Sequence, residues 1–417
     1  MDDLISSEEY YKYGIEASEM KSFKESLYFY TKAIELNPNF ADAYFCRGYA
    51  HYDLCEMSAA ISDYDKAIEL NPFCAEIYYK RGLATSFLSN YSLAIEDYSK
   101  AIELNPNKEI KYYFDRALLY KTMEDYTNAL LDLSKVIELD PLYVEAYHRR
   151  GLTYLLLEDY NNAILNFTKM IEKDPKDVRA YINRGNIFID LKYYSKAISD
   201  FSRAIETDPN YSNAYCYRGN AYGNILKNYS KAIIDYTKAI EIDPSDPYVY
   251  DNRGVNYYYL NDYANAISDF TKAIELNPKS ARFYFKRGLA YSRLQNYSKA
   301  LYDFTKAIEL NPSDEYAYNN RGSINNDLQN YSEALSDCNK AIELEPEFAF
   351  AYDTRGSVYN NIQDYSKAIS DFTKAIELNS NYAIAYFNRG NAYYNSGDNI
   401  KAREDWQKAY SLGYIEE

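Results

Sequence analysis

Apolar residues recur along the chain at steps of three and four positions, in short stretches separated by polar runs. In segment 41–74, one such stretch runs from Asp42 to Leu54 and a second from Ser58 to Leu70. The apolar positions of the second stretch fall on one side of a helix: Ala60, Ile61, Tyr64, Ala67 and Ile68. This spacing predicts two amphipathic helices in the segment.

The predicted helix pair returns twelve times with a period of 34 residues, which is typical of a solenoid. Ten of the eleven prolines follow the second helix: Pro38, Pro72, Pro106, Pro141, Pro175, Pro209, Pro244, Pro278, Pro312 and Pro346. Proline cannot continue a helix, so it marks the end of each repeat. Two repeats are one residue longer, and we place the extra residues near Asn107–Glu109, between repeats, and near Leu226–Lys227, in the turn inside repeat 7.

Small residues occupy fixed places where two helices of a repeat would approach closely. Gly48 and Ala60 are examples, and they are surrounded by bulky residues such as Tyr44 and Tyr64. Because one short hairpin cannot bury its apolar face alone, neighbouring repeats must stack. We therefore expect one domain over 1–417, with repeats at about 7–40, 41–74, 75–109, 110–143, 144–177, 178–211, 212–246, 247–280, 281–314, 315–348, 349–382 and 383–417.

The repeated residues resemble those of the tetratricopeptide repeat (TPR) family. In the segment that begins at Ala281, the matching residues are Tyr284, Gly288, Tyr291, Ala300, Phe304, Ala307 and Pro312. The resemblance covers about residues 7–417. It implies an all-α fold, a right-handed α-solenoid superhelix of helix-turn-helix TPR units, whose first helices line a concave face that binds peptides.

Arginine precedes the repeated small residue in eleven repeats, where the family pattern has leucine; the small residue is Ala117 in repeat 4 and glycine in the others. Ten repeats also carry aspartate at one place of the second helix, the place of Asp303. We predict an ion pair between the two helices of a repeat, for example Arg287 with Asp303, because the planar guanidinium suits a carboxylate. The alternative is a solvated arginine with no fixed partner. Repeat 1 has Tyr13 and Phe29 at these two places.

The chain carries 62 acidic and 46 basic residues, a formal charge of −16. This excess argues against a nucleic-acid partner, which needs a basic face. No apolar run approaches the ~18 residues of a membrane span, and the first residues show no secretory signal. The five cysteines do not have the spacing of a metal-binding or redox motif, which suggests that they are reduced thiols. We expect a cytoplasmic protein with no membrane partner.

Catalytic chemistry is not visible in the sequence. There are two histidines, in different repeats, and no nucleophile elbow, phosphate loop or HExxH motif. The acidic residues follow the repeat, so no local pair stands out. We expect no enzyme activity, no cofactor and no metal.

The candidate binding residues lie on the first helices, at places where the residue differs from one repeat to the next. Repeats 2 and 3 place Tyr49, Tyr52 and Tyr79 among acidic residues, which predicts an aromatic, negative end suited to a basic or apolar segment. Repeats 7–9 match part of the family's carboxylate clamp with Asn220, Asn252, Arg282 and Lys286. Cations and amides converging on a carboxylate would hold a peptide terminus. Cys216 stands at the place of the clamp's first lysine, and a chance match among the repeat triplets is the alternative.

These observations favour a non-catalytic scaffold or adaptor that binds protein segments in the groove of its first helices. Many similar repeats suit an extended partner or several partners at once. The alternative is a regulatory or assembly factor that acts through self-association. The final predicted helix, residues 400–412, mixes charged residues with Trp406, so we expect a self-capped end and a monomer.

Overall fold

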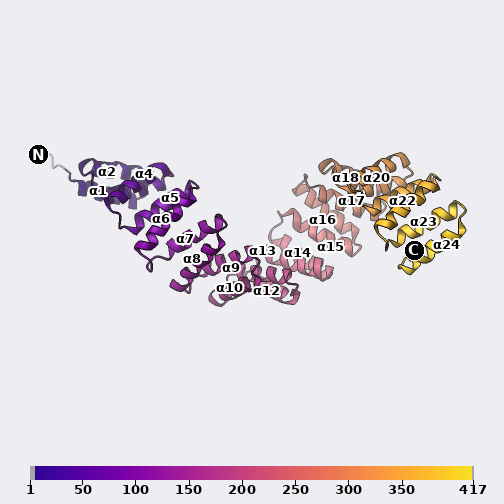
Figure 1. The fold of residues 1–417 in the computed structure, drawn as a ribbon, viewed down its shortest axis with the longest axis horizontal. Helices are drawn as coiled ribbons and strands as arrows, with labels where there is room; N and C mark the ends of the chain where they lie inside the picture. The colour runs from indigo at the N-terminus through magenta and orange to yellow at the C-terminus, as the bar shows by residue number, and fades with distance from the viewer. Residues whose placement is uncertain (1–4, 416–417) are drawn as a thin grey trace. The chain divides into compact units, whose positions relative to one another are not determined.

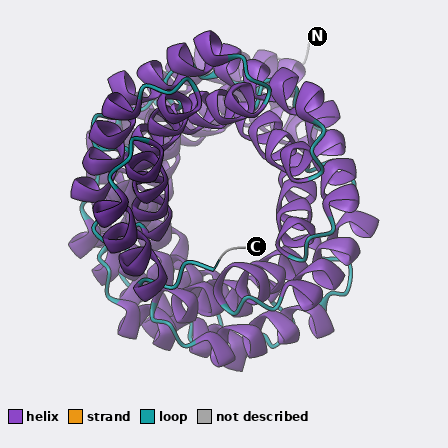
Figure 2. Ribbon diagram, turned by 90° about the vertical axis from the view of Figure 1, so that its right-hand side faces the viewer, coloured by secondary structure: helices purple, strands orange, loops and turns teal. Residues whose placement is uncertain are grey.

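The computed structural model describes residues 5–415, which form α-helices joined by short turns, with no strand among them (Figure 2). The chain divides into two compact halves, Met1–Thr207 and Asp208–Glu417, here called the N-terminal half and the C-terminal half. Each repeat contributes a first helix with an odd number and a second helix with an even number (Figure 1). The predicted all-α architecture of stacked helical hairpins is confirmed within each half, whereas a single domain over 1–417 stays a prediction.

In the N-terminal half the helices are α1 (Ser7–Glu19), α2 (Phe23–Leu36), α3 (Ala41–Asp53), α4 (Met57–Leu70), α5 (Ala75–Phe87), α6 (Tyr91–Leu104), α7 (Ile110–Thr122), α8 (Tyr126–Leu139), α9 (Val144–Leu156), α10 (Tyr160–Lys173), α11 (Val178–Asp190) and α12 (Tyr194–Thr207). The first described helix begins with the capping box of Ser6 and Glu9. In this box each side chain accepts a hydrogen bond from the backbone N–H of the other residue. Two N–H groups that have no acceptor within the helix are thereby satisfied.

In the C-terminal half the helices are α13 (Ser212–Asn220), the π-helical turn η1 (Ala221–Ile225), α14 (Tyr229–Ile242), α15 (Pro247–Tyr259), α16 (Tyr263–Leu276), α17 (Ala281–Arg293), α18 (Tyr297–Leu310), α19 (Glu315–Asp327), α20 (Tyr331–Leu344), α21 (Ala349–Asn361), α22 (Tyr365–Leu378), α23 (Ala383–Asn395) and α24 (Asn399–Ser411). Most second helices in both halves begin after an Asn or Asp cap, such as Asn296, whose side chain accepts the Lys299 N–H.

The extra residue of repeat 7 is not in the turn, so that prediction was wrong. Lys227 keeps the left-handed backbone (φ 55°) that Lys192 has at the same place in repeat 6 (φ 63°), which shows that the turn has its normal length. The added residue instead widens the helix into the π-helical turn Ala221–Ile225. Gly223 lies in this turn, where an added Cβ would collide with the Asn256 side-chain amide unless that side chain moved.

The repeated small residues lie where the two helices of a repeat meet, as predicted. A Cβ on Gly48 would come 2.8 Å from the Tyr64 ring and 3.2 Å from the Ala60 carbonyl oxygen. Tyr64 itself is fully buried. In repeat 4 alanine replaces the glycine, and its partner is Leu133 instead of a ring, so the added methyl group is accommodated.

The predicted arginine–aspartate pairs are present in ten repeats. The guanidinium Nη2 donates to the carboxylate Oδ1 over 2.6–2.8 Å in every pair: Arg47–Asp63, Arg81–Asp97, Arg116–Asp132, Arg184–Asp200, Arg218–Asp235, Arg253–Asp269, Arg287–Asp303, Arg321–Asp337, Arg355–Asp371 and Arg389–Asp405. In repeat 5, Arg150 donates to Asn166 instead. In repeat 1, Tyr13 and Phe29 form an aromatic contact with ring centroids 5.8 Å apart.

The same arginine also reaches the preceding repeat, a contact that the repeat pattern did not predict. Arg287 Nη1 donates to Thr271 Oγ1 of the preceding second helix at 3.1 Å, and Arg321 does the same to Thr305. Each such guanidinium therefore joins three helices, two of its own repeat and one of its neighbour. A charged group thus stabilises both the hairpin and the stacking of hairpins.

The turn between the two helices of a repeat contains one residue with a positive φ. In eleven repeats this residue is not glycine, whereas repeat 12 has Gly397 there (φ 94°). Gln363 is an example, with φ 66°. A left-handed conformation costs a residue with a Cβ about 1–2 kcal/mol, and glycine avoids that cost while losing more entropy on folding.

Replacing Gln363 with glycine should therefore stabilise the protein by about 0.5–1 kcal/mol. Urea denaturation followed by circular dichroism would measure the change. Gln363→Ala removes the same side chain but keeps a Cβ, and it should bring no gain. A glycine variant no more stable than the alanine variant would contradict the assignment of strain to this turn.

Candidate functional site

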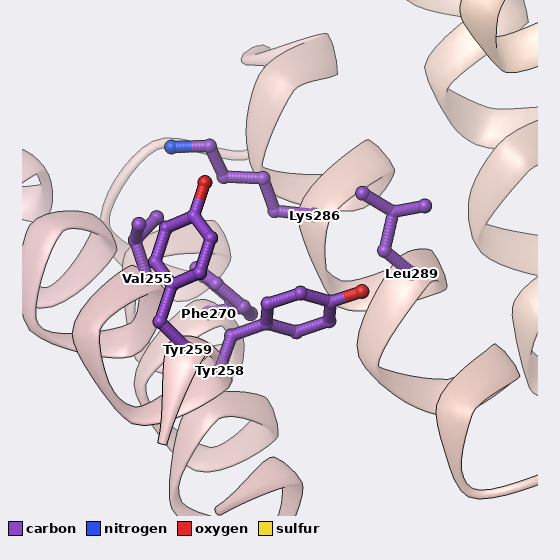
Figure 3. Close-up of a pocket in the computed structure, with 6 residues that line it drawn as sticks. All are labelled: Val255, Tyr258, Tyr259, Phe270, Lys286 and Leu289. Atoms are coloured by element: carbon purple, nitrogen blue, oxygen red, sulfur yellow. The ribbon is translucent and has the colours of Figure 1, made fainter. Parts of the chain in front are cut away.

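A cavity of about 260 Å³ opens between two successive first helices of the C-terminal half, α15 and α17 (Figure 3). Its walls are mainly apolar and aromatic: Val255, Tyr258, Tyr259, Phe270, Lys286 and Leu289. The Tyr259 hydroxyl points toward the Lys286 side chain, and the Tyr258 hydroxyl points toward Leu289 (Figure 3). Arg293 donates to the Tyr258 hydroxyl at 3.1 Å and fixes that wall. The cavity could take one apolar side chain of a partner.

Two cations and one carboxylate meet beside this cavity. Arg282 Nη2 and Lys286 Nζ lie 2.6 Å and 3.0 Å from Asp251 Oδ2. Asp251 is fully buried, and its Oδ1 atom has no hydrogen-bond partner among the described residues. Burial lowers the pKa of Lys286, and the Arg282 charge acts in the same direction, while Asp251 opposes the shift. The cluster keeps one positive charge in excess, with the Arg282 side chain 53% exposed.

Asp251 was not among the predicted site residues. At its place in the repeat most first helices have an apolar or aromatic residue, such as Phe45 or Phe285. A buried carboxylate at that place was therefore a visible exception to the pattern. Its position explains why α17 carries two cations one turn apart, since both contact it across the repeat boundary.

The structure brings together only part of the predicted clamp. Arg282 and Lys286 converge on one carboxylate, and Asn252 follows that residue in α15. Asn220, at the end of α13, accepts the Tyr236 hydroxyl at 2.7 Å. Burial raises the pKa of Cys216 to about 12, so this thiol adds no charge in place of the clamp's lysine. Whether these groups bind a carboxylate stays a prediction.

The three tyrosines predicted for the N-terminal half differ in accessibility. Tyr49 is 37% exposed, and the Lys80 ammonium lies 4.6 Å from its ring centroid. Tyr52 is half-buried, and burial raises its pKa. Tyr79 is buried and donates its hydroxyl to Asp115 at 2.6 Å. Tyr49 is thus the tyrosine that offers most surface to a partner.

Comparison with known families shows that the chain belongs to the tetratricopeptide repeat family. Models described as "Tetratricopeptide repeat" match residues 41–74, 75–108, 110–141, 144–177, 212–246, 281–314, 315–348 and 383–413. A further model, described as "TPR repeat", matches residues 19–54, 185–225, 256–295 and 356–397. Together these matches extend over most of the chain. No protein with a curated description matches it.

Among solved structures, a tetratricopeptide repeat protein from Parabacteroides merdae is 24% identical, with a TM-score of 0.50. The match covers 57% of this chain and 94% of that one, and it shows the fold alone. YrrB, described as a TPR protein with an unusual peptide-binding site, is 26% identical, with coverage of 44% and 95% and a TM-score of 0.39. The APC/C hetero-tetramer Cut9–Hcn1 is 15% identical, with coverage of 98% and 94% and a TM-score of 0.47.

No helix among residues 5–415 combines the length and the apolar character that a membrane span requires.

Proposed function

We propose that this protein is a non-catalytic scaffold that binds segments of partner proteins on the face formed by its first helices. The observation that carries the proposal is the apolar cavity between α15 and α17, bordered by two cations that share one carboxylate. An apolar wall with a few charged groups at its edge is the usual composition of a ligand site. The cytoplasm is the compartment that we propose for it.

The bound segment would carry a carboxylate. Arg282 and Lys286 supply two positive charges against the one of Asp251, and an incoming carboxylate would balance the excess. The clamp residues Asn220 and Asn252 would add amide donors. Tyr49 and Tyr52 would form a second contact region in the N-terminal half, beside the buried Tyr79.

Titration with an acidic peptide tests this site. A peptide with a free C-terminal carboxylate should bind the full-length protein about tenfold more tightly than its amidated form, since one charge-assisted hydrogen bond is worth about 1.5 kcal/mol. Isothermal calorimetry would give both affinities. Equal affinities would reject the clamp.

Two variants distinguish binding of the peptide at this site from nonspecific electrostatic attraction between the peptide and the protein. Arg282→Gln removes the exposed cation and should abolish the preference for the free carboxylate. Arg403→Gln removes an exposed cation of α24 and should leave it unchanged. Affinity capture from native cytosol with the wild type and with Arg282→Gln would then show which partner depends on this region. Identical sets of captured proteins would contradict the proposed site.

A further inference from the structure

The outer sides of α1 and α24 carry residues that differ from those at the same places in the other repeats. At the boundaries within each half, a second helix packs against the next first helix. Ala392 of α23, for example, shares a buried cluster with Phe372 of α22, and Ile369 of α22 packs against that cluster. Ile324 and Leu301 hold the same places at the boundary between repeats 9 and 10. These internal boundaries show which places would meet if a second copy of the chain packed on the first.

The charges at these places are exceptions, and they have opposite signs. The place of Ala392 holds a neutral residue in the other first helices, whereas α1 has Glu16 there. The place of Ile369 holds leucine or isoleucine in eleven repeats, whereas α24 has Arg403 there. Both charged side chains are exposed, and neither has an ion-pair partner among residues 5–415. A second copy packed in the manner of a neighbouring repeat would bring Glu16 of one chain to Arg403 of the other.

An apolar pair accompanies the two charges. Met20, which follows α1, is 81% exposed, and Ile400 of α24 is 75% exposed. The place of Ile400 is serine or threonine in eight of the other eleven repeats. Between repeats 2 and 3, Ser58 and Leu88 hold the places of Ile400 and Met20, and both line the same surface pocket. The same packing between two copies would therefore cover both exposed side chains.

The arginine contact that joins neighbouring repeats also has a counterpart. Arg389 Nη1 donates to Thr373 Oγ1 across the boundary between repeats 11 and 12, at 3.1 Å. Tyr13 holds the place of this arginine in α1, and Gln407 holds the place of the threonine in α24. Both side chains are exposed. A tyrosine hydroxyl can donate to an amide oxygen, so these two polar groups could satisfy each other in a contact between copies.

The remaining exceptions are Glu9 of α1 and Tyr410 of α24. They hold the places of Ala385 and Ile376, which belong to one buried cluster at the boundary between repeats 11 and 12. The hydroxyl of Tyr410 can donate to the carboxylate of Glu9. Each polar exception on one side thus has a chemical complement on the other. We call Tyr13, Glu16 and Met20 the α1 face, and Ile400, Arg403 and Gln407 the α24 face.

The residue that follows the last helix leaves the α24 face open. Tyr414 stacks on Phe387 of α23, with ring centroids 4.2 Å apart. Phe40, which precedes α3, makes the same kind of contact with Tyr11 of α1, at 4.9 Å. Tyr414 therefore takes the position of a loop residue that comes before a next first helix.

Polar residues on the two faces would also be expected if they only kept the end repeats soluble, as in the self-capped monomer expected from the sequence. Solubility requires polar groups but no relation between the two ends. It explains neither the opposite charges of Glu16 and Arg403 nor the exposed Met20 and Ile400, at places that meet across the internal boundaries.

We propose that the α1 face of one copy packs on the α24 face of another, so that copies of this protein associate head to tail. The contact joins two different surfaces, so it is heterologous and produces rings or open chains of copies. The inference goes beyond the proposed scaffold function, because it does not involve the cavity between α15 and α17. Association of this kind would place several copies of that cavity in one assembly.

Sedimentation velocity of the full-length protein tests the association itself. From about 1 μM to about 1 mM, the range of weak and transient contacts, the average mass should rise with concentration above that of one chain. A mass equal to one chain at every concentration would overturn the proposal.

Charge reversal tests which residues make the contact. Glu16→Arg and Arg403→Glu should each weaken association at least tenfold, because attraction becomes repulsion between like charges. The double variant Glu16→Arg/Arg403→Glu should regain the wild-type association within about threefold, and so should an equal mixture of the two single variants. Circular dichroism would confirm that each variant is folded. A folded double variant that associates as weakly as the single variants would overturn the proposal.

Two controls distinguish this contact from an effect of net charge and from the carboxylate site. Lys408→Glu reverses another exposed cation of α24 and should change association less than twofold. A loss equal to that of Arg403→Glu would indicate general electrostatics and overturn the assignment. Arg282→Gln should leave association unchanged, so the head-to-tail contact and the carboxylate site can fail independently. Loss of association in Arg282→Gln would place the contact at α17 and equally overturn it.

Discussion

Replacing Arg287 with alanine should destabilise repeats 8–10 by about 3–5 kcal/mol, which is the cost of leaving one member of a buried ion pair without its partner. Asp303 is fully buried and accepts two hydrogen bonds from Arg287. The same guanidinium donates to Thr271 of repeat 8, so its loss also weakens the stacking between repeats. The effect should be largest in α16, α17 and α18.

Hydrogen exchange of backbone amides would measure this change, because it reports the stability of each helix in a repeat protein that need not unfold in one step. Arg150→Ala provides the matched control. Arg150 occupies the same place in repeat 5 but donates to the neutral Asn166, so its loss strands no charge and should cost about 1–2 kcal/mol. Equal effects of the two substitutions would show that the ion pair adds nothing beyond a hydrogen bond.

Replacing Asp353 with asparagine should stabilise the C-terminal repeats at neutral pH. Burial raises the pKa of Asp353 to about 6, while hydrogen bonds from Asn388 and Tyr382 oppose the shift. The folded state therefore holds the proton more tightly than the unfolded state, in which the ordinary pKa of this group is 3.8. Stability is lost as pH rises from about 4 to about 6, and the loss approaches 3 kcal/mol above pH 7.

Asparagine has almost the same shape and carries no charge, so it avoids this loss. The stability difference between Asp353→Asn and the wild type should be small at pH 4 and should grow to about 2–3 kcal/mol at pH 7. Urea denaturation at several pH values, with hydrogen exchange in α21–α24, would follow it. Glu347→Gln, at an exposed loop carboxylate, should show no such trend. A constant difference between pH 4 and pH 7 would exclude ionisation of Asp353 as its cause.

The two largest expected effects differ in how visible they were in the sequence. Arg287 and Asp303 recur together through ten repeats, and repeat 1 lacks both residues, so their pairing could be predicted. Asp353 and Asp251 are the two aspartates at a place of the repeat that is otherwise mostly apolar or aromatic. Sequence shows such an exception, but the pKa depends on burial and on the neighbouring Asn388 and Tyr382, which belong to the next repeat and the loop before it.

The clamp illustrates the same limit. The order of Asn220, Asn252, Arg282 and Lys286 along the chain matched a known pattern, yet the two cations already contact Asp251, and Asn220 accepts the Tyr236 hydroxyl. The added residue of repeat 7 was visible as a change of spacing, but its place was not. A helix can absorb one residue as a π-helical turn, and the pattern of apolar residues does not distinguish this from a longer turn.

The sequence by itself determined the helix pairs, their period, the close contact at Gly48 and the ion pairs within repeats. All of these depend on residues close together in the chain, and the same residues recur at fixed places in most repeats. Only the tertiary structure decided which side chains of successive repeats meet: Arg287 with Thr271, Asp251 with Arg282 and Lys286, and Asp353 with Asn388. These contacts join residues of neighbouring repeats, and their geometry depends on how neighbouring hairpins stack, which no single repeat encodes.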